Sequence, residues 1–248
     1  MGNLLTDVKN ELFHAVERSA GDPPIAIAFS GGIDSTTLAQ ICKKIGIQIT
    51  LLTVGFHGSP DIEFSQFIAS KLGLPHKIKE LNRQDLQKKL KYIYSKMECR
   101  NISHLENCIA FLFLGAVAKK VGTRSILSAN GCDELFCGYD RFRLVYQLGK
   151  VRLRQLMHEK IRNEFHLMNE VDEVTSEFGI NIKQPFMSER FISFALQIPI
   201  ENKIKNCNDL IRKHVLREAA LSIGVPQEAA MRPKKALQYG SFIHKYFC

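Results

Sequence analysis

The chain has 248 residues, of which 45% are hydrophobic and 24% charged, so that a sizeable core is available. No run approaches the ~18 uninterrupted apolar residues of a membrane helix, and the N-terminus lacks a signal-peptide stretch; we therefore expect a cytoplasmic protein without membrane contact. The net charge of +9 suits nucleic acid and equally suits small anionic ligands, so charge alone excludes neither.

The first half of the chain alternates strand and helix patterns. An amphipathic helix over 1–20 ends at the turn 21–24. Alternating strands and helices of this length predict an α/β fold with a parallel sheet, whose ligands bind beyond the carboxyl ends of the strands. The predicted strands are 25–29, 48–56, 76–81 and 125–129, and the predicted helices are 34–45, 61–73, 84–96 and 107–121.

Helical patterns dominate from Asp140 onward, over 141–169, 186–197, 208–222 and a last short piece. We expect one domain over 1–248, with an α/β core over 1–140 and a helical lobe over 141–248 that completes the site. The lobe has a basic stretch up to Arg162 and an acidic one from Glu164. We interpret these as a charged surface, and a docking patch for an acidic partner or RNA is the alternative.

The cysteines form an odd, scattered set with no CxxC pair and no metal-like spacing. This pattern is typical of reduced thiols, and we expect neither disulfides nor zinc. The cysteines lie at positions 42, 99, 108, 132, 137, 207 and 248.

The most informative stretch is the turn between the first strand and the next helix. Two glycines let the backbone turn tightly and bring its N–H groups close to a ligand, while hydroxyls lie at the positive end of the helix. The turn therefore predicts an anion cradle, and an ordinary turn is the alternative. No lysine follows the glycines, unlike in the GK[ST] nucleotide loop. The sequence is Ser30-Gly31-Gly32-Ile33-Asp34-Ser35-Thr36.

Two carboxylates follow the fourth predicted strand directly. Asp133 and Glu134 should lie at the carboxyl edge of the sheet, near Asp34 in the anion cradle. Hard oxygen ligands there suit Mg²⁺, which keeps several waters and bridges carboxylates to phosphates. We expect Asp34 and Asp133 to bind Mg²⁺, and a helix cap is the alternative for Asp133.

The chain resembles the asparagine synthetase branch of the ATP pyrophosphatases over roughly residues 20–241. The turn is similar to the SGGxDS signature that grips the pyrophosphate of ATP, which implies an adenine nucleotide alpha hydrolase-like core and nucleotide contacts from Ser30, Gly31, Gly32, Asp34, Ser35 and Thr36. Four further segments resemble the branch in order: Gly131-Cys-Asp133-Glu134-Leu-Phe136-Cys-Gly138-Tyr139, Asp172 thirteen positions before Pro185-Phe186, Arg212-Lys213-His-Val-Leu216-Arg217, and Arg232-Pro-Lys234.

The resemblance also implies roles for single residues. Lys234 matches the lysine that approaches the α-phosphate, where a fixed cation stabilises charge in the transition state. Arg232 is expected to act in the same way. Glu134 is the third candidate catalytic residue, and Lys213 is a candidate for binding the substrate. A solvated basic tail is the alternative for the segment around Lys234.

The chain departs from the family's pattern in three places, which concern the source of nitrogen and the carboxylate that accepts it. Gly2 stands where glutamine-hydrolysing members have a cysteine, so we expect no glutaminase domain, and a separate glutaminase subunit is a candidate partner. Asn181 and Lys183 replace a glutamate and an arginine before the Pro-Phe pair, and Asn130 replaces a glutamate three residues before the aspartate. A neutral amide cannot take a proton from ammonium. Either a nearby acid such as Glu134 compensates, or the acceptor is not aspartate; we favour the second.

The sequence predicts an ATP-dependent, AMP-forming amide ligase. ATP and Mg²⁺ would activate a carboxylate as an acyl-adenylate, and ammonia or an amine would displace AMP. One alternative is a tRNA base-modifying enzyme of the thiolation type, which the positive charge suits and the missing CxxC pairs oppose. Another is a nucleotide-binding subunit that partners a separate glutaminase, which the presence of Asp34, Asp133 and Lys234 opposes.

Overall fold

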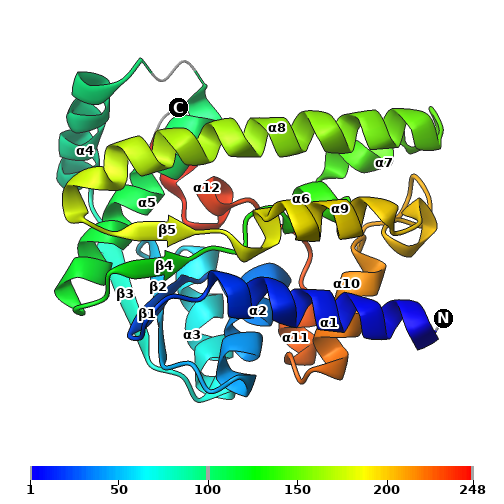
Figure 1. Ribbon diagram of the computed structural model, residues 1–248. Helices are drawn as coiled ribbons and strands as arrows, with labels where there is room; N and C mark the ends of the chain where they lie inside the picture. Colours follow the sequence, from blue (N-terminus) through cyan, green and yellow to red (C-terminus); the bar gives the residue numbers. More distant parts are fainter. Residues whose placement is uncertain (1, 99–100, 247–248) are drawn as a thin grey trace.

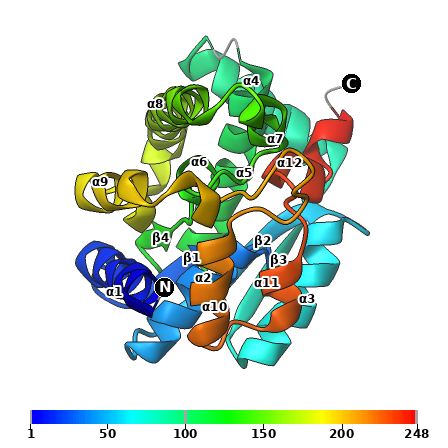
Figure 2. The ribbon, with the colours of Figure 1, turned by 90° about the vertical axis from the view of Figure 1, so that its right-hand side faces the viewer.

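A computed structural model describes residues 2–98 and 101–246. Its centre is a sheet of five parallel strands in the order β3-β2-β1-β4-β5, covered by helices on both faces (Figures 1 and 2). The direction in which strands are added reverses between β1 and β4, so a crevice opens there at the carboxyl edge. The strands are β1 (Ile25–Ala28), β2 (Ile49–Phe56), β3 (His76–Leu81), β4 (Ser125–Leu127) and β5 (Asn181–Lys183).

The helices connect the strands and form most of the second half of the chain (Figure 1). Short 3-10 turns cover Ser176–Phe178, Pro185–Met187, Ile200–Asn202 and Ile243–Tyr246. The α-helices are α1 (Gly2–Ser19), α2 (Ile33–Lys44), α3 (Pro60–Leu72), α4 (Arg83–Lys96), α5 (Ile102–Lys120), α6 (Cys132–Leu135), α7 (Asp140–Tyr146), α8 (Lys150–Thr175), α9 (Glu189–Gln197), α10 (His214–Ser222), α11 (Gln227–Met231) and α12 (Leu237–Gly240).

The core lies on both faces of the sheet because successive strand residues point to opposite sides. Ile25 and Ile27 of β1 pack in the hydrophobic cluster that also contains residues of α1, α2 and α10. Ala26 between them packs in the cluster on the other face, with residues of α5 and α8. Strands buried on both faces read as continuous apolar runs, which is why β1 and β2 are recognisable in the sequence.

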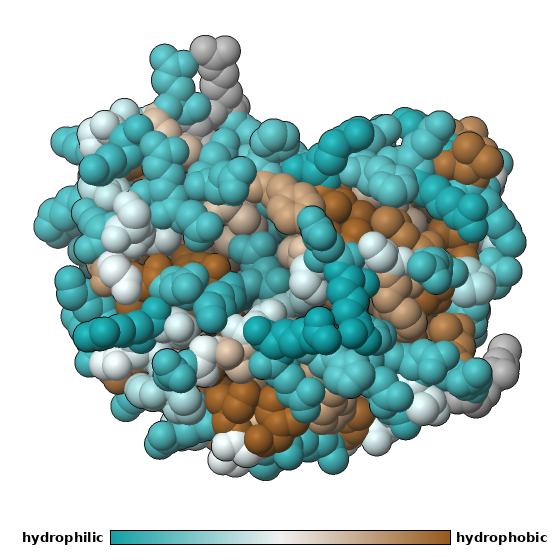
Figure 3. Space-filling view, in the orientation of Figure 1, coloured by the Kyte–Doolittle hydropathy of each residue, from teal (hydrophilic) through white to brown (hydrophobic). Residues whose placement is uncertain are grey.

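Helix α5 has the length and apolar composition of a membrane-crossing helix, and 67% of its most apolar 18-residue stretch is buried inside the fold. It packs against β2, β3 and β4 on one face of the sheet. On the face seen in Figure 3, apolar side chains lie in separate patches among hydrophilic ones. The composition of α5 therefore follows from its place in the core.

The second half of the chain differs from the prediction in three places. β5 adds a strand beside β4, so the sheet extends beyond residue 140 into the part expected to be helical. The predicted helix 141–169 is two helices, α7 and α8, separated at Gly149, whose φ is +89°. The predicted helix 208–222 begins only at His214.

The prediction of reduced cysteines agrees with the structure for Cys42, Cys132, Cys137 and Cys207, which are free thiols. Cys99 and Cys248 lie outside the described residues. Within the described part of the chain, no group of three or more His, Cys, Asp or Glu side chains is arranged to hold a metal ion.

Candidate active site

The turn after β1 has the geometry of an anion cradle. Gly31 adopts a left-handed conformation with φ +74°, and a Cβ there would lie 3.0–3.2 Å from atoms of Phe64 and Ser65, so only glycine fits. The Ser30 Oγ accepts a hydrogen bond from the Gly32 N–H at 3.3 Å, and the Ser35 Oγ accepts one from the Ser30 N–H at 3.3 Å. These bonds hold the hydroxyls at the start of α2.

Thr36 is the exception among the predicted nucleotide contacts. Its side chain is fully buried in α2, and its Oγ1 has no hydrogen-bond partner among the described residues. Unlike Ser35, the residue before it on the helix, Thr36 lines no cavity that the described residues form at this edge of the sheet. The prediction that Thr36 contacts the nucleotide through its side chain is therefore not supported by its position.

A buried lysine joins the two carboxylates that the sequence predicts as metal ligands. The Lys213 Nζ lies 2.8 and 2.6 Å from the two Asp34 carboxylate oxygens and 2.6 Å from Asp133 Oδ1. Lys234 forms an ion pair with the other Asp133 oxygen. Asp34 and Asp133, 99 residues apart in sequence, are thus brought together at the carboxyl edge as predicted, because α2 and α6 begin directly after neighbouring strands β1 and β4.

The charges in this cluster shift the pKa values of its members. Burial alone would raise the pKa of Asp133, but the ammonium groups of Lys213 and Lys234 outweigh it and lower the pKa to about 2. Burial would lower the pKa of Lys213, and the carboxylates of Asp133 and Asp34 raise it instead. Asp133, Lys213 and Lys234 are therefore charged at neutral pH.

The structure explains why residue 138, in the segment 131–139, is a glycine. A Cβ at this position would lie 2.0 Å from Asp133 Oδ1 and 2.2 Å from Lys213 Cε. The backbone of residue 138 therefore covers the ion pair so closely that no side chain fits. The segment 131–139 fixes the acid and its lysine partner together.

A small recess lies over the cradle and is lined by five cations. We call it the basic recess; its volume is about 40 Å³. A concentration of positive charge around backbone N–H groups is what a polyphosphate requires. The cradle residues Ser30, Gly32, Ile33, Asp34 and Ser35 form its floor, and Lys213, Arg217, Arg232, Lys234 and Lys235 supply the charge.

Arg232 holds the segment Arg232-Pro-Lys234, here called the closing segment, onto the anion cradle. Its guanidinium donates to the Ser30 carbonyl oxygen at 2.9 Å, pairs with Asp61 at 3.1 Å and lies 4.1 Å from the centre of the Phe64 ring. Burial raises the pKa of Asp61 to about 6, against the lowering effect of Arg232. Arg232 lines the basic recess, and its guanidinium already donates three hydrogen bonds to the protein, to the carbonyl oxygens of Ser30 and Pro60 and to the Asp61 carboxylate.

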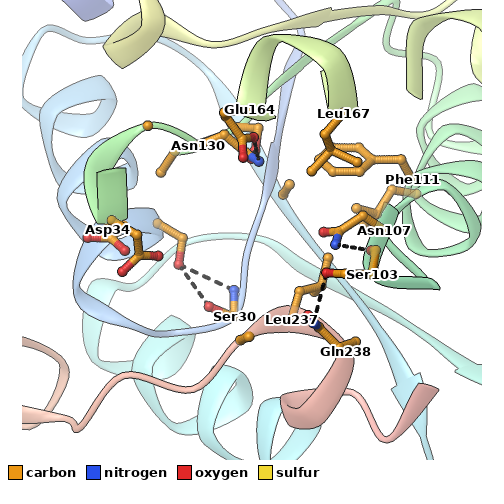
Figure 4. Close-up of a pocket in the computed structure, with 18 of the residues that line it drawn as sticks. Ser30, Asp34, Ser103, Asn107, Phe111, Asn130, Glu164, Leu167, Leu237 and Gln238 are labelled. Atoms are coloured by element: carbon orange, nitrogen blue, oxygen red, sulfur yellow. Dashed lines mark hydrogen bonds between the residues drawn. The ribbon is translucent and has the colours of Figure 1, made fainter. Parts of the chain in front are cut away.

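A larger cavity of about 240 Å³, here called the main cavity, adjoins the basic recess. Ser30, Asp34, Ser35 and Lys234 line both, so the two lie side by side. One part of its lining, here called the apolar slot, comes from the end of β1 and the middle of β2 and consists of Ala28, Phe29, Leu52, Thr53 and Val54. The opposite part lies between α5, α8 and α12, where Figure 4 shows Ser103, Asn107, Phe111, Glu164, Leu167, Leu237 and Gln238.

The wall of the main cavity beside α6 contains buried acids. The Tyr139 hydroxyl donates to the Glu134 carboxylate. Burial, together with the charges of Glu164 and Asp133, raises the pKa of Glu134 to about 8. Glu164, from α8, is 4% exposed, and burial raises its pKa as well. The cavity therefore contains two acids that hold protons more tightly than acids in water.

Two acceptor-side predictions have different outcomes. Asn130 lines the main cavity beside Glu164 (Figure 4). Asn181 does not join it: β5 runs parallel to β4, so its first residue lies at the amino edge of the sheet, opposite to the crevice. The structure thus corrects the grouping of Asn181 with the acceptor site. Lys213 lies between the two aspartates, not in the main cavity.

Sequence reasoning missed several residues of the site. Glu164 and Lys160 lie on α8, in a stretch whose mixed charges indicate a solvated surface, yet both line the main cavity. His104 is buried on α5, with Nδ1 2.8 Å from Glu170 and Nε2 3.2 Å from Asn163. The signal that could have revealed them is a spacing of about one helical turn along α8, which predicts that one face of this helix points inward. The residues on that face are Lys160, Asn163, Glu164 and Leu167.

Comparison with known proteins agrees with this geometry. The sequence model of the family described as asparagine synthase matches residues 7–168 and 146–247. The chain belongs to the asparagine synthase family. Among curated members, it is 26% identical to asparagine synthetase B (glutamine-hydrolyzing) of Escherichia coli, with 94% of this chain and 45% of that protein aligned. It is 27% identical to the glutamine-hydrolyzing asparagine synthetase of Brassica oleracea, over 82% of this chain and 36% of that protein.

The chain thus spans about half the length, or less, of the curated relatives it matches. Among solved structures, an NMN synthetase from Francisella tularensis is similar, with a TM-score of 0.50, 14% sequence identity, and coverage of 96% of this chain and 76% of that chain. At that identity the likeness shows the fold alone. It confirms the expected parallel-sheet fold of the ATP pyrophosphatases.

Proposed function

We propose that this chain is an ATP-dependent amide ligase, which activates a carboxylate as an acyl-adenylate and transfers ammonia or an amine to it. The observation that carries the proposal is that the basic recess and the main cavity lie side by side and share Ser30, Asp34, Ser35 and Lys234. The recess suits the phosphates of ATP and the apolar slot suits its base. The rest of the main cavity has room for a small acid beside the α-phosphate.

The first step forms a bond between a carboxylate oxygen of the acceptor and the α-phosphorus of ATP. The bond from that phosphorus to the bridging oxygen breaks, and pyrophosphate leaves with the electron pair. Lys234 lines both cavities and lies at their junction, so its ammonium can stabilise the charge that develops at the α-phosphate. Asp133 holds Lys234 in place and raises its pKa, against the effect of burial.

Asp34 and Asp133 fit a Mg²⁺ site. Their oxygens lie around one cation position, now taken by the Lys213 ammonium, and Mg²⁺ needs only one or two protein carboxylates beside the phosphates of its substrate. When bound, Mg²⁺ would neutralise phosphate charge and help pyrophosphate to leave. In this structure the Lys213 ammonium is the counter-ion that keeps the two carboxylates together.

The second step joins nitrogen to the acyl carbon and releases AMP. We propose ammonia or a primary amine as the nitrogen source, either free or delivered by a separate glutaminase. The relatives named above are glutamine-hydrolyzing enzymes, and this chain aligns with about half of the E. coli protein. We further propose a cytoplasmic location, where ATP is available.

An ATP–pyrophosphate exchange screen tests the proposed function. The full chain is incubated with ATP, Mg²⁺, labelled pyrophosphate and one acid at a time, drawn from L-aspartate, L-glutamate and the corresponding acids without an amino group. We expect label to enter ATP only when a true acceptor is present. If no acid supports exchange, the proposal is wrong.

A further inference from the structure

The position of Asn130 lacks an acid, but α8 brings one into contact with it. We propose that Glu164 is the base that takes a proton from the incoming nitrogen, a role that the side chain of Asn130 cannot perform. This inference rests on the proposed function and adds the residue that makes its second step possible. It adds a second acid, besides Glu134, that could compensate for the neutral amide.

The contact between the two residues is direct and oriented. The Asn130 Nδ2 donates to Glu164 Oε1 at 2.5 Å, and the Ser128 hydroxyl donates to Asn130 Oδ1. The second bond fixes the amide so that its NH₂ group faces the acid. Because Ser128 and Asn130 follow β4 directly, the end of this strand determines where the carboxylate of Glu164 lies.

The carboxylate is placed to receive a ligand. Glu164 is 4% exposed yet lines the main cavity, and Figure 4 shows it pointing from α8 toward Asn130, across the cavity from Ser30. Among the residues that the structure describes, only its Oε1 has a hydrogen-bond partner. The second oxygen, Oε2, is therefore available to accept a hydrogen bond from a nitrogen inside the cavity.

The surroundings adjust the basicity of Glu164. Burial raises its pKa, the Asn130 hydrogen bond lowers it, and Asp133 raises it again. The other groups around this part of the cavity are Glu134 on α6, His104 on α5, Lys234 in the closing segment and Lys160 one turn earlier on α8. A carboxylate with a raised pKa accepts a proton from ammonium more readily than one in water.

The proton balance is simple. An ammonium ion, or a protonated primary amine, gives one proton to Glu164 and gains a free electron pair. That pair forms the C–N bond to the acyl carbon, and the C–O bond to AMP breaks with its electrons on AMP. The second proton of the nitrogen passes to solvent as the neutral amide forms.

The test separates the base from a structural role by changing the nucleophile. Ammonium must lose a proton before it attacks, whereas hydroxylamine is largely unprotonated near neutral pH. With the acid found in the exchange screen, amide and hydroxamate formation are measured for the wild type and Glu164→Gln. The matched control is Glu159→Gln, which removes an exposed carboxylate of the same helix that pairs with Arg152 at the surface.

We expect Glu164→Gln to keep acid-dependent exchange within about 2-fold, to lose about 100-fold or more in amide formation from ammonium, and to lose less than about 10-fold with hydroxylamine. Glu159→Gln should behave as wild type. Adding Asn130→Glu to Glu164→Gln should recover at least about 10-fold of the ammonium activity, because the two side chains are in contact. The retained exchange shows that the variant is folded.

Several results would overturn the inference. Equal losses with both nucleophiles, a parallel loss of exchange, or undiminished amide formation from ammonium would each exclude Glu164 as the base. If the wild type supports no exchange with any acid, the proposed function itself fails first. The two failures are therefore distinguishable.

Discussion

Lys213 offers the sharpest test of the charged cluster. Lys213→Met keeps the length of the side chain and removes the ammonium that lies 2.6–2.8 Å from Asp34 and Asp133. Lys213 is 1% exposed and Asp133 is 7% exposed, so water cannot replace the lost charge. Removing one partner of a buried ion pair costs about 3–5 kcal/mol in the free energy of unfolding. At about 2–4 °C per kcal/mol for a chain of this size, the melting temperature should fall by about 6–20 °C.

The pH dependence of this loss is equally specific. In the wild type the pKa of Asp133 is lowered from 3.8 to about 2, so its ionisation stabilises the fold above about pH 3.8, and this contribution is lost as the pH falls through about 2. Without Lys213 we expect burial, the largest influence on Asp133, to raise its folded-state pKa above 3.8, so that its ionisation destabilises the variant as the pH rises from 4 to 7. The difference between variant and wild type should therefore be largest near pH 7 and smaller near pH 4.

Chemical unfolding followed by circular dichroism at both pH values measures the effect. The control is Lys235→Met, which removes an exposed lysine of the same region and should change stability by about 0.5 kcal/mol or less. If Lys213→Met were no less stable than Lys235→Met at pH 7, the buried ion pairs would not hold this site together. A loss that did not change with pH would refute the linkage to Asp133.

Three further predictions concern single side chains of the site. Lys234→Ala should lower kcat for pyrophosphate release by about 100-fold and change KM for ATP much less, as steady-state kinetics can show; equal changes would make Lys234 a ground-state contact. Gly138→Ala should lower the free energy of unfolding by about 1–3 kcal/mol, because its Cβ would overlap Asp133 and Lys213; unchanged stability in a denaturant titration would contradict this. Glu134→Gln should flatten the stability profile between about pH 5 and 9: the raised pKa of Glu134 makes the wild type less stable as pH rises toward about 8, and an unchanged slope would show that the residue is not buried as an acid.

The sequence predicts the part of the site that depends on strand ends. The strand-turn-helix pattern around Asp34 and the carboxylate after the fourth strand could be placed at one edge, because parallel strands end together. The fifth strand could not be predicted, because it has only three residues and only Ile182 among them is buried. The long apolar runs of β1 and β2 have no counterpart there.

The segment before α10 shows why local patterns failed elsewhere. Residues 208–213 continue the helical pattern of α10, but Arg212 and Lys213 have φ values of +49° and +54°. Asp209 stabilises this turn by accepting hydrogen bonds from the N–H groups of residues 211 and 212. The turn directs Lys213 toward Asp34 and Asp133, so a tertiary requirement overrides the helix propensity.

The transfer of oxygen from the acceptor to AMP tests the central claim most directly. An acid identified by exchange is labelled with ¹⁸O in its carboxylate and incubated with the full chain, ATP, Mg²⁺ and ammonium, and the products are analysed by mass spectrometry. An acyl-adenylate intermediate predicts one ¹⁸O atom in each AMP formed, because the acyl C–O bond breaks in the second step. AMP without label, or ADP and phosphate as products, would contradict the account.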